Sequence, residues 1–146
     1  MVAYVFGALA IAAAVLAVVY RGDDDAPRAL PVCGRTNQTI RRPAALPVRF
    51  PLPRGTEFAS ATRATGVLVV EGRVPLGLVS ATRFFRTGLP RAGFRLGAGD
   101  AEPGREAESE FFGRGVRGRF KVRLLFGCKG ASMLLVSMID VASSAR

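Results

Sequence analysis

The sequence predicts an α+β protein: an N-terminal transmembrane helix, then a small domain with one amphipathic helix packed on a mainly antiparallel sheet of four to five strands. Three observations predict this class. Residues 2–20 are apolar throughout, residues 106–126 alternate like two strands around a Gly-rich turn, and one stretch near residue 80 has helical spacing. The chain then divides into an anchor or signal peptide (1–20), a Pro-containing tether (21–47), a globular domain (48–142) and a tail (143–146).

The apolar run from Val2 to Tyr20 carries no charged residue. As a helix it would be roughly 28 Å long, enough to cross the hydrocarbon core of a bilayer. A cleaved signal peptide usually has a basic region before a shorter apolar core, and no Lys or Arg precedes this run. We therefore expect a single-pass membrane anchor; the alternative is a signal peptide, which would leave a secreted domain.

The direction of insertion has two conflicting indicators. Arg21, Arg28 and Arg35 follow the apolar run, and the positive-inside rule, counted strictly, places the domain in the cytosol. The two cysteines and the Pro-rich tether favour the other side, because disulfides persist in oxidising compartments. We predict an extracytoplasmic domain in the cell envelope.

Cys33 and Cys128 are the two cysteines of the chain. A disulfide between them would close a loop of about 95 residues and contribute on the order of 4 kcal/mol in the chain-entropy model. The alternative is a pair of unlinked buried thiols. We predict the disulfide, since a domain of this size has only a modest core.

The net charge is +10, and all the basic residues except Lys121 and Lys129 are Arg. Such a field favours anionic partners, namely lipid head groups, acidic envelope polymers or nucleic acid, although a generally soluble Arg-rich surface gives the same composition. Histidine is absent, which removes the commonest general base and metal ligand. We expect no metal and no cofactor.

The first elements of the domain follow from local pattern. Val48–Leu52 alternates and predicts a short edge strand, and Gly66–Val74 is rich in β-branched residues and predicts a second strand. Pro75 suits a first helical position, and apolar residues then recur at helical spacing as far as Thr87. Gly88 and Pro90 predict the end of that helix. The face expected to be buried consists of Leu78, Ala81 and Phe85, with Phe84 also assigned to the core.

The remaining strands lie on either side of a hairpin. Phe94–Leu96 predicts the start of a strand, followed by a polar loop through Gly99, Asp100 and Pro103. Ala131–Val141 is almost continuously apolar, which predicts a central strand covered on both faces.

The hairpin itself is predicted from two alternating runs of opposite charge, one of Glu and one of Arg and Lys. Centred between Gly115 and Val116, it places both sets of charges on one face and the aromatic residues on the other. The basic residues then form a solvated ladder with the carboxylates. The expected partners are Glu110 with Lys121, Glu108 with Arg123, and Phe111 with Phe120.

Residues 113–118 match G-x-G-x-x-G, the dinucleotide-binding fingerprint. The fingerprint needs a helix after the glycines, and here a strand pattern follows, so we interpret the glycines as hairpin-turn residues. Backbone amides in such a turn can hold an anion. The candidate anion-binding residues are Arg114, Gly115, Arg117 and Arg119.

Three functions are compatible with these patterns. We expect a non-catalytic, membrane-anchored module that binds the lipid bilayer through its anchor and a protein or anionic polymer of the envelope through its domain. The first alternative is a carboxylate-dependent enzyme that uses the cluster Glu102, Glu106, Glu108 and Glu110. The second is a nucleic-acid binder on the cytosolic face, which the predicted burial of Phe111 and Phe120 disfavours.

Two motifs carry a resemblance to a known class. Pro53-Arg54-Gly55-Thr56 precedes the first main strand, and Phe84-Phe85-Arg86 leads to Leu89-Pro90-Arg91-Ala92-Gly93-Phe94. Over about Val48–Val141 the chain resembles small α+β domains that follow a membrane anchor or lipoprotein signal in bacterial envelope proteins of unknown function. The resemblance implies a fold and a location, and it carries no catalytic residue to this chain.

Overall fold

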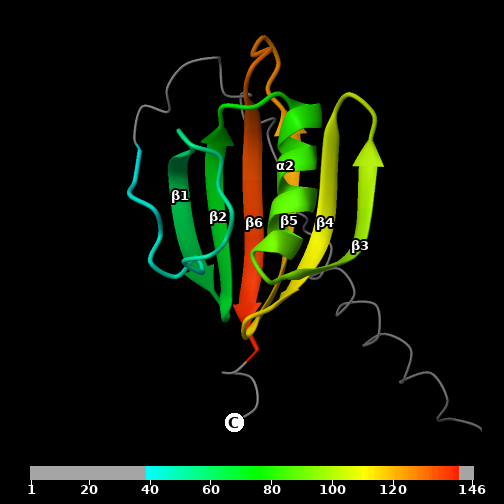
Figure 1. Cartoon of the computed structure of the whole chain (residues 1–146). Coiled ribbons are helices and arrows are strands. Elements are labelled where there is room, and N and C mark those ends of the chain that lie inside the picture. Colours follow the sequence, from blue (N-terminus) through cyan, green and yellow to red (C-terminus); the bar gives the residue numbers. More distant parts are fainter. Residues whose placement is uncertain (1–38, 142–146) are drawn as a thin grey trace, which may run out of the picture. The chain divides into compact units, whose positions relative to one another are not determined.

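A computed structural model describes residues 39–141, which form one six-stranded antiparallel sheet and one helix (Figure 1). The predicted α+β class with a single helix on an antiparallel sheet is confirmed, with one strand more than the largest number expected. Along the sheet the strands are ordered β1-β2-β6-β5-β4-β3. The elements are β1 (Glu57–Ala64), β2 (Val67–Val74), α2 (Leu78–Arg91), β3 (Arg95–Glu102), β4 (Glu106–Gly113), β5 (Val116–Leu124) and β6 (Ser132–Asp140).

One face of the sheet is covered by two different segments. The helix α2 packs against β3, β4 and β5, while residues 39–56 pass in front of β1 and β2 on the same side (Figure 1). Leu46 and Phe50 from that segment lie in the same buried cluster as Phe85 of α2. We call residues 39–56 and 78–91 together the helix-side layer, and the opposite face of the sheet its outer face.

Aromatic rings dominate the core beneath the helix. The ring centroid of Phe50 lies 5.3 Å from that of Phe111 and 6.1 Å from that of Phe85, and Phe85 lies 5.3 Å from Phe120. Edge-to-face and tilted arrangements at these separations add to the burial of the rings themselves. The predicted burial of Phe85, Phe111 and Phe120 is confirmed, since each is 0% exposed.

The predicted edge strand at Val48–Leu52 is wrong, because this stretch forms turns. Phe50 donates its backbone N–H to the carbonyl of Pro47 at 2.8 Å, and prolines at 47, 51 and 53 lack the N–H groups that a strand would donate. The edge strand is instead β1, which the sequence pattern did not reveal. It joins β2 through Thr65 and Gly66, whose φ angles of 47° and 83° build a two-residue hairpin turn.

The helix begins at Leu78, after Gly77, and not at the predicted Pro75; it continues past both predicted stop residues to Arg91. Pro90 is tolerated because the last turn is already ending in a Schellman arrangement at Gly93, whose φ is +89°. Phe94 donates its N–H to the carbonyl of Leu89 at 3.0 Å, and Gly93 donates to that of Pro90 at 3.0 Å. The predicted buried positions Ala81 and Phe85 are confirmed, and Leu89 completes that face. Leu78 and Phe84, also predicted to be buried, are only partly buried against the core.

Strand β3 also runs further than predicted, through Gly99 and Asp100 to Glu102. The expected polar loop is reduced to a tight turn in which Arg105 donates its N–H to the carbonyl of Glu102 at 3.0 Å. A Cβ at Gly99 would lie 2.7 Å from the carbonyl oxygen of Glu108 on β4. Glycine, which has no Cβ, therefore allows β3 to pair with β4 at this position.

The hairpin β4–β5 exists as predicted, but its register differs by two residues. Arg114 and Gly115 form a two-residue turn with φ angles of 53° and 77°, which pairs Gly113 with Val116. A shift of two keeps every side chain on its predicted face while changing its partner. The observed partners are Glu106 with Arg123, Glu108 with Lys121, Glu110 with Arg119, and Phe111 with Gly118.

Strand β6 is central in the sheet as predicted, between β2 and β5. The expectation that it is covered on both faces is wrong, because only alternate side chains are buried. Leu134, Val136 and Met138 face the core, whereas Met133 and Leu135 on the outer face are half-buried.

The predicted anchor Val2–Tyr20, most of the tether, Cys33 and the tail lie outside the described residues. Between residues 39 and 141 no helix is long and apolar enough to cross a membrane. The disulfide therefore stays a prediction. Its second residue, Cys128, is 4% exposed and packs with Leu125 and Ala131 in a small cluster at the turn between β5 and β6.

Candidate functional site

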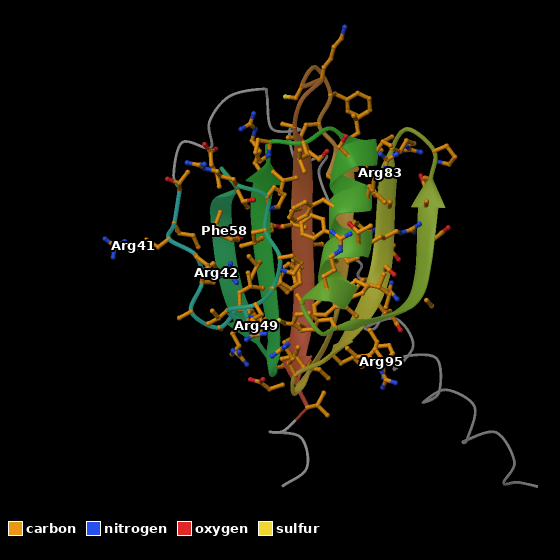
Figure 2. The ribbon with its side chains drawn as sticks, viewed as in Figure 1. Arg41, Arg42, Arg49, Phe58, Arg83 and Arg95 are labelled. Carbon is orange, nitrogen blue, oxygen red and sulfur yellow. The ribbon has the colours of Figure 1, made fainter. Side chains whose placement is uncertain are left out.

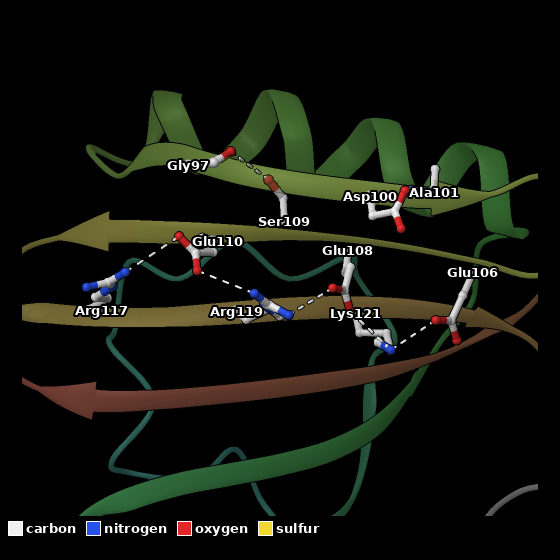
Figure 3. Close-up of polar contacts among 10 residues, drawn as sticks. All are labelled: Gly97, Asp100, Ala101, Glu106, Glu108, Ser109, Glu110, Arg117, Arg119 and Lys121. Carbon is white, nitrogen blue, oxygen red and sulfur yellow. Dashed lines mark hydrogen bonds and ion pairs between the residues drawn. The ribbon is translucent and has the colours of Figure 1, made fainter.

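The glutamates of β4 form a continuous ion-pair ladder with the bases of β5 on the outer face (Figure 3). Lys121 Nζ lies 2.9 Å from Glu106 Oε1 and 3.0 Å from Glu108 Oε2. Arg119 bridges the next two carboxylates, at 2.9 Å from Glu108 Oε1 and 3.4 Å from Glu110 Oε1. The ladder ends with Arg123 at 3.0 Å from Glu106 Oε2 and Arg117 at 3.7 Å from Glu110 Oε2.

The ladder stabilises the charged states of Glu106 and Lys121. Hydrogen bonding to Lys121 lowers the pKa of Glu106 from its ordinary value, against a smaller opposing effect of burial. The pKa of Lys121 is raised, first by its hydrogen bond to Glu106 and then by that to Glu108. A general acid at neutral pH needs a carboxyl whose pKa is raised, so the ladder opposes that role for Glu106.

The candidate anion-binding turn is only partly assembled. The side chain of Arg114 extends away from the turn and donates its Nε–H to the carbonyl of Ala92 at 2.8 Å. Ala92 follows the last residue of α2, where a positive charge complements the helix dipole. Arg117 and Arg119 point along the outer face into the carboxylate ladder (Figure 3). Gly115 supplies the left-handed backbone of the turn. The arginines of this motif therefore already have oxygen partners.

Of the carboxylates in the proposed catalytic cluster, Glu102 stands apart from the ladder. It forms an exposed ion pair with Arg105 at 3.5 Å across the β3–β4 turn. Among residues 39–141 no group of three or more His, Cys, Asp and Glu side chains could hold a metal ion. The four glutamates are thus distributed between structural ion pairs.

The helix-side layer has a different charge distribution. It contains seven arginines and no Asp or Glu, and four of them, Arg41, Arg42, Arg49 and Arg83, are labelled in Figure 2. Within the described part of the chain, none of the ion pairs includes an arginine of this layer. The remaining members are Arg54, Arg86 and Arg91.

Arg42 has a structural role within the layer. Its guanidinium donates to the carbonyl oxygens of Pro47 at 2.6 Å, Val48 at 3.1 Å and Phe50 at 3.4 Å. Burial lowers the pKa of this guanidinium from its ordinary value, and the side chain stays charged because arginine titrates far above neutral pH. Arg42 therefore folds the loop that carries Val48 and Arg49 to the surface.

Two arginines of α2 line a shallow groove of about 410 Å³ between the helix and the β3–β4 turn. Arg83 and Arg86, both exposed, lie on the helix wall of this groove. The opposite wall is formed by Ala101, Pro103 and Ala107, and by Glu102 and Glu106, which already pair with other bases. The groove is open and lined by positive charge on the helix side.

Comparisons of the chain with protein-family models, with curated proteins and with solved structures found no match. The resemblance to envelope domains stays a prediction.

The helix-side layer was not predicted from the sequence, although the sequence contains a signal for it. Residues 26–56 and 72–99 contain no Asp or Glu, and both intervals carry several arginines. What the sequence alone did not give is that the two intervals meet on one face. That requires knowing that residues 39–56 cover β1 and β2 on the same side as α2.

Proposed function

We propose that the protein is a membrane-anchored, extracytoplasmic, non-catalytic module whose domain binds an anionic component of the envelope through the helix-side layer. The observation that carries the proposal is the segregation of charge. The outer face neutralises its bases with carboxylates, while the helix-side layer presents arginines without any carboxylate of its own. A surface of one sign attracts partners of the other.

The two alternatives receive less support from the described residues. The carboxylate-dependent enzyme needs free glutamates, and Glu106, Glu108 and Glu110 are each held by two contacts to bases. The nucleic-acid binder needs exposed aromatic platforms, and Phe111 and Phe120 are fully buried.

The location is tested by topology reporters fused to the C-terminus of the full chain, combined with thiol labelling before and after reduction. The proposal expects a reporter active only outside the cytosol and labelling of Cys33 and Cys128 only after reduction. A cytosolic reporter would contradict the extracytoplasmic assignment.

Anion binding is tested with the full chain in detergent and inorganic polyphosphate as the probe. Binding should weaken as salt rises, because screening reduces attraction between exposed charges. The double variant R83Q/R86Q should bind less, while R117Q/R123Q, which removes the same charge from the outer face, should bind like the parent protein. Equal loss in both variants would show that net charge alone, and no particular face, determines binding.

A further inference from the structure

The helix-side layer also carries exposed apolar side chains next to its bases. Val48 is 90% exposed and precedes Arg49, and Val79 is 71% exposed, one helical turn from Arg83. Ile40, at 41% exposure, precedes Arg41. Exposed apolar side chains among basic residues are the combination found on protein surfaces that lie in a membrane interface.

The pairing of arginine with exposed aliphatic residues discriminates between anionic partners. A soluble polymer of acidic groups attracts the arginines but has nothing to shield Val48 and Val79 from water. An anionic bilayer offers both, since head groups meet the guanidinium groups and the acyl boundary receives apolar side chains. A predicted anchor at residues 2–20, joined by a tether of limited length, would also keep the domain beside such a surface.

From this combination we infer that the helix-side layer is a membrane-contact face, on which the domain lies against the head groups of an anionic bilayer with Val48 and Val79 entering the interface. The inference rests on the proposed anion binding by this layer and names its partner class. The sheet's outer face, whose bases are paired with carboxylates in the ladder, then points away from the lipid and remains accessible to other molecules.

The chain contains no Trp, so one introduced indole reports from a single position. We would reconstitute the full chain as Val48→Trp, as Val79→Trp and as the control Ile139→Trp, whose position on the outer face is 37% exposed. The vesicles contain equal parts of phosphatidylglycerol and phosphatidylcholine with brominated acyl chains. We expect quenching and a blue shift at positions 48 and 79, and neither at position 139.

Charge dependence is tested on the same samples. Vesicles of brominated phosphatidylcholine alone, or high salt with the mixed vesicles, should abolish the quenching at positions 48 and 79. In the Val79→Trp background, R83Q/R86Q should weaken surface attachment about 30-fold, from roughly one factor of five per arginine near an anionic surface. R117Q/R123Q should leave it unchanged. Each carboxylate of the ladder keeps at least one basic partner in this control, which protects the fold.

The outcomes separate this inference from the proposed function. Unquenched indoles at positions 48 and 79, together with salt-sensitive polyphosphate binding by the detergent-solubilised chain, would overturn the membrane-contact face and leave anion binding in place. If the indoles are unquenched and the solubilised chain also shows no salt-sensitive binding of polyphosphate, both the membrane-contact face and the proposed anion binding are overturned. Equal quenching at position 139 would show that the domain has no preferred face toward the lipid, which also contradicts the inference.

Discussion

Gly118→Ala tests the arrangement of the sheet at its most crowded point. Gly118 lies in β5 opposite Phe111 of β4 and Met138 of β6. A Cβ at this position would fall on the carbonyl oxygen of Ser137, and it would lie 2.7 Å from both Met138 Cβ and Phe111 Cζ. Real Cβ atoms do not approach backbone so closely, so the substitution must displace a central strand or the Phe111 ring, which is fully buried.

The magnitude follows from overpacking in a dense core. Inserting a methyl group into a packed interior destabilises by about 1–3 kcal/mol, and the obstruction by backbone on one side favours the upper part of that range. For a domain of this size each kcal/mol corresponds to about 4–8 °C in Tm, so Gly118→Ala should lower Tm by about 10 °C or more. Thermal unfolding followed by circular dichroism measures it.

Gly130→Ala is the matched control, because nothing lies within 4 Å of a Cβ there and no positive φ is involved. It should leave Tm within a few degrees of the parent, as surface substitutions usually do. If Gly118→Ala is as stable as Gly130→Ala, then Phe111 does not sit over position 118. The observed register of β4 against β5 would be refuted, and the register centred between Gly115 and Val116 would have to be reconsidered.

Three further outcomes are expected. R114Q, which removes the donor to the last turn of α2, should lower the free energy of unfolding by about 0.5–1 kcal/mol in denaturant titration, and R114K should recover part of it; no change would remove the capping role. E106Q should destabilise by less than about 1 kcal/mol at neutral pH. Because the folded-state pKa of Glu106 is lowered, the difference should vanish as the pH falls through that pKa, and a difference that persisted in acid would point to packing rather than charge. Replacing Cys33 or Cys128 with Ser should lower stability by roughly 2–5 kcal/mol if they are linked, whereas unlinked thiols would label in denaturant without reduction.

Strong local pattern was sufficient for much of the fold. The β-branched run of β2, the helical spacing of Ala81 and Phe85, and the charge alternation of β4 and β5 each identified the correct element. These segments have a buried face that repeats with the period of their secondary structure, so the sequence alone predicts them.

The missed features depend on contacts between distant residues. Strand β1 has Phe58 as its one large buried side chain and is otherwise small or polar, so its pairing with β2 holds it in the sheet. The helix passes Pro90 because Gly93 and Phe94 end it further on. Neither fact is visible in a local window, since propensity is a weak guide when tertiary contacts compete with it.

The candidate site shows the same division. Face assignment along β4 and β5 was correct, so the sequence predicted that the glutamates would be neutralised by bases. The exact partners were predicted wrongly, because a register shift of two residues changes the partner of every side chain but leaves each side chain on the same face of the sheet. Opposite charges face one another in both registers, so the turn decides between them: the observed register places Arg114 and Gly115 in the left-handed region, whereas the predicted one would place the β-branched Val116 in the turn.

Arginine-rich composition explains how many bases the chain has, but it does not explain where the carboxylates are. If the positive charge were only a by-product of composition, acidic residues should be as common beside Arg49 and Arg83 as beside Arg119. Instead the carboxylates of β4 lie opposite bases that would otherwise repel one another across the sheet, while residues 39–56 and 78–91 have none.

Stability accounts for the ladder, because like charges on neighbouring strands need compensation. It gives no reason to keep the helix-side layer uncompensated, and mixed charges there would serve solubility equally well. An anionic partner for that layer supplies the missing reason.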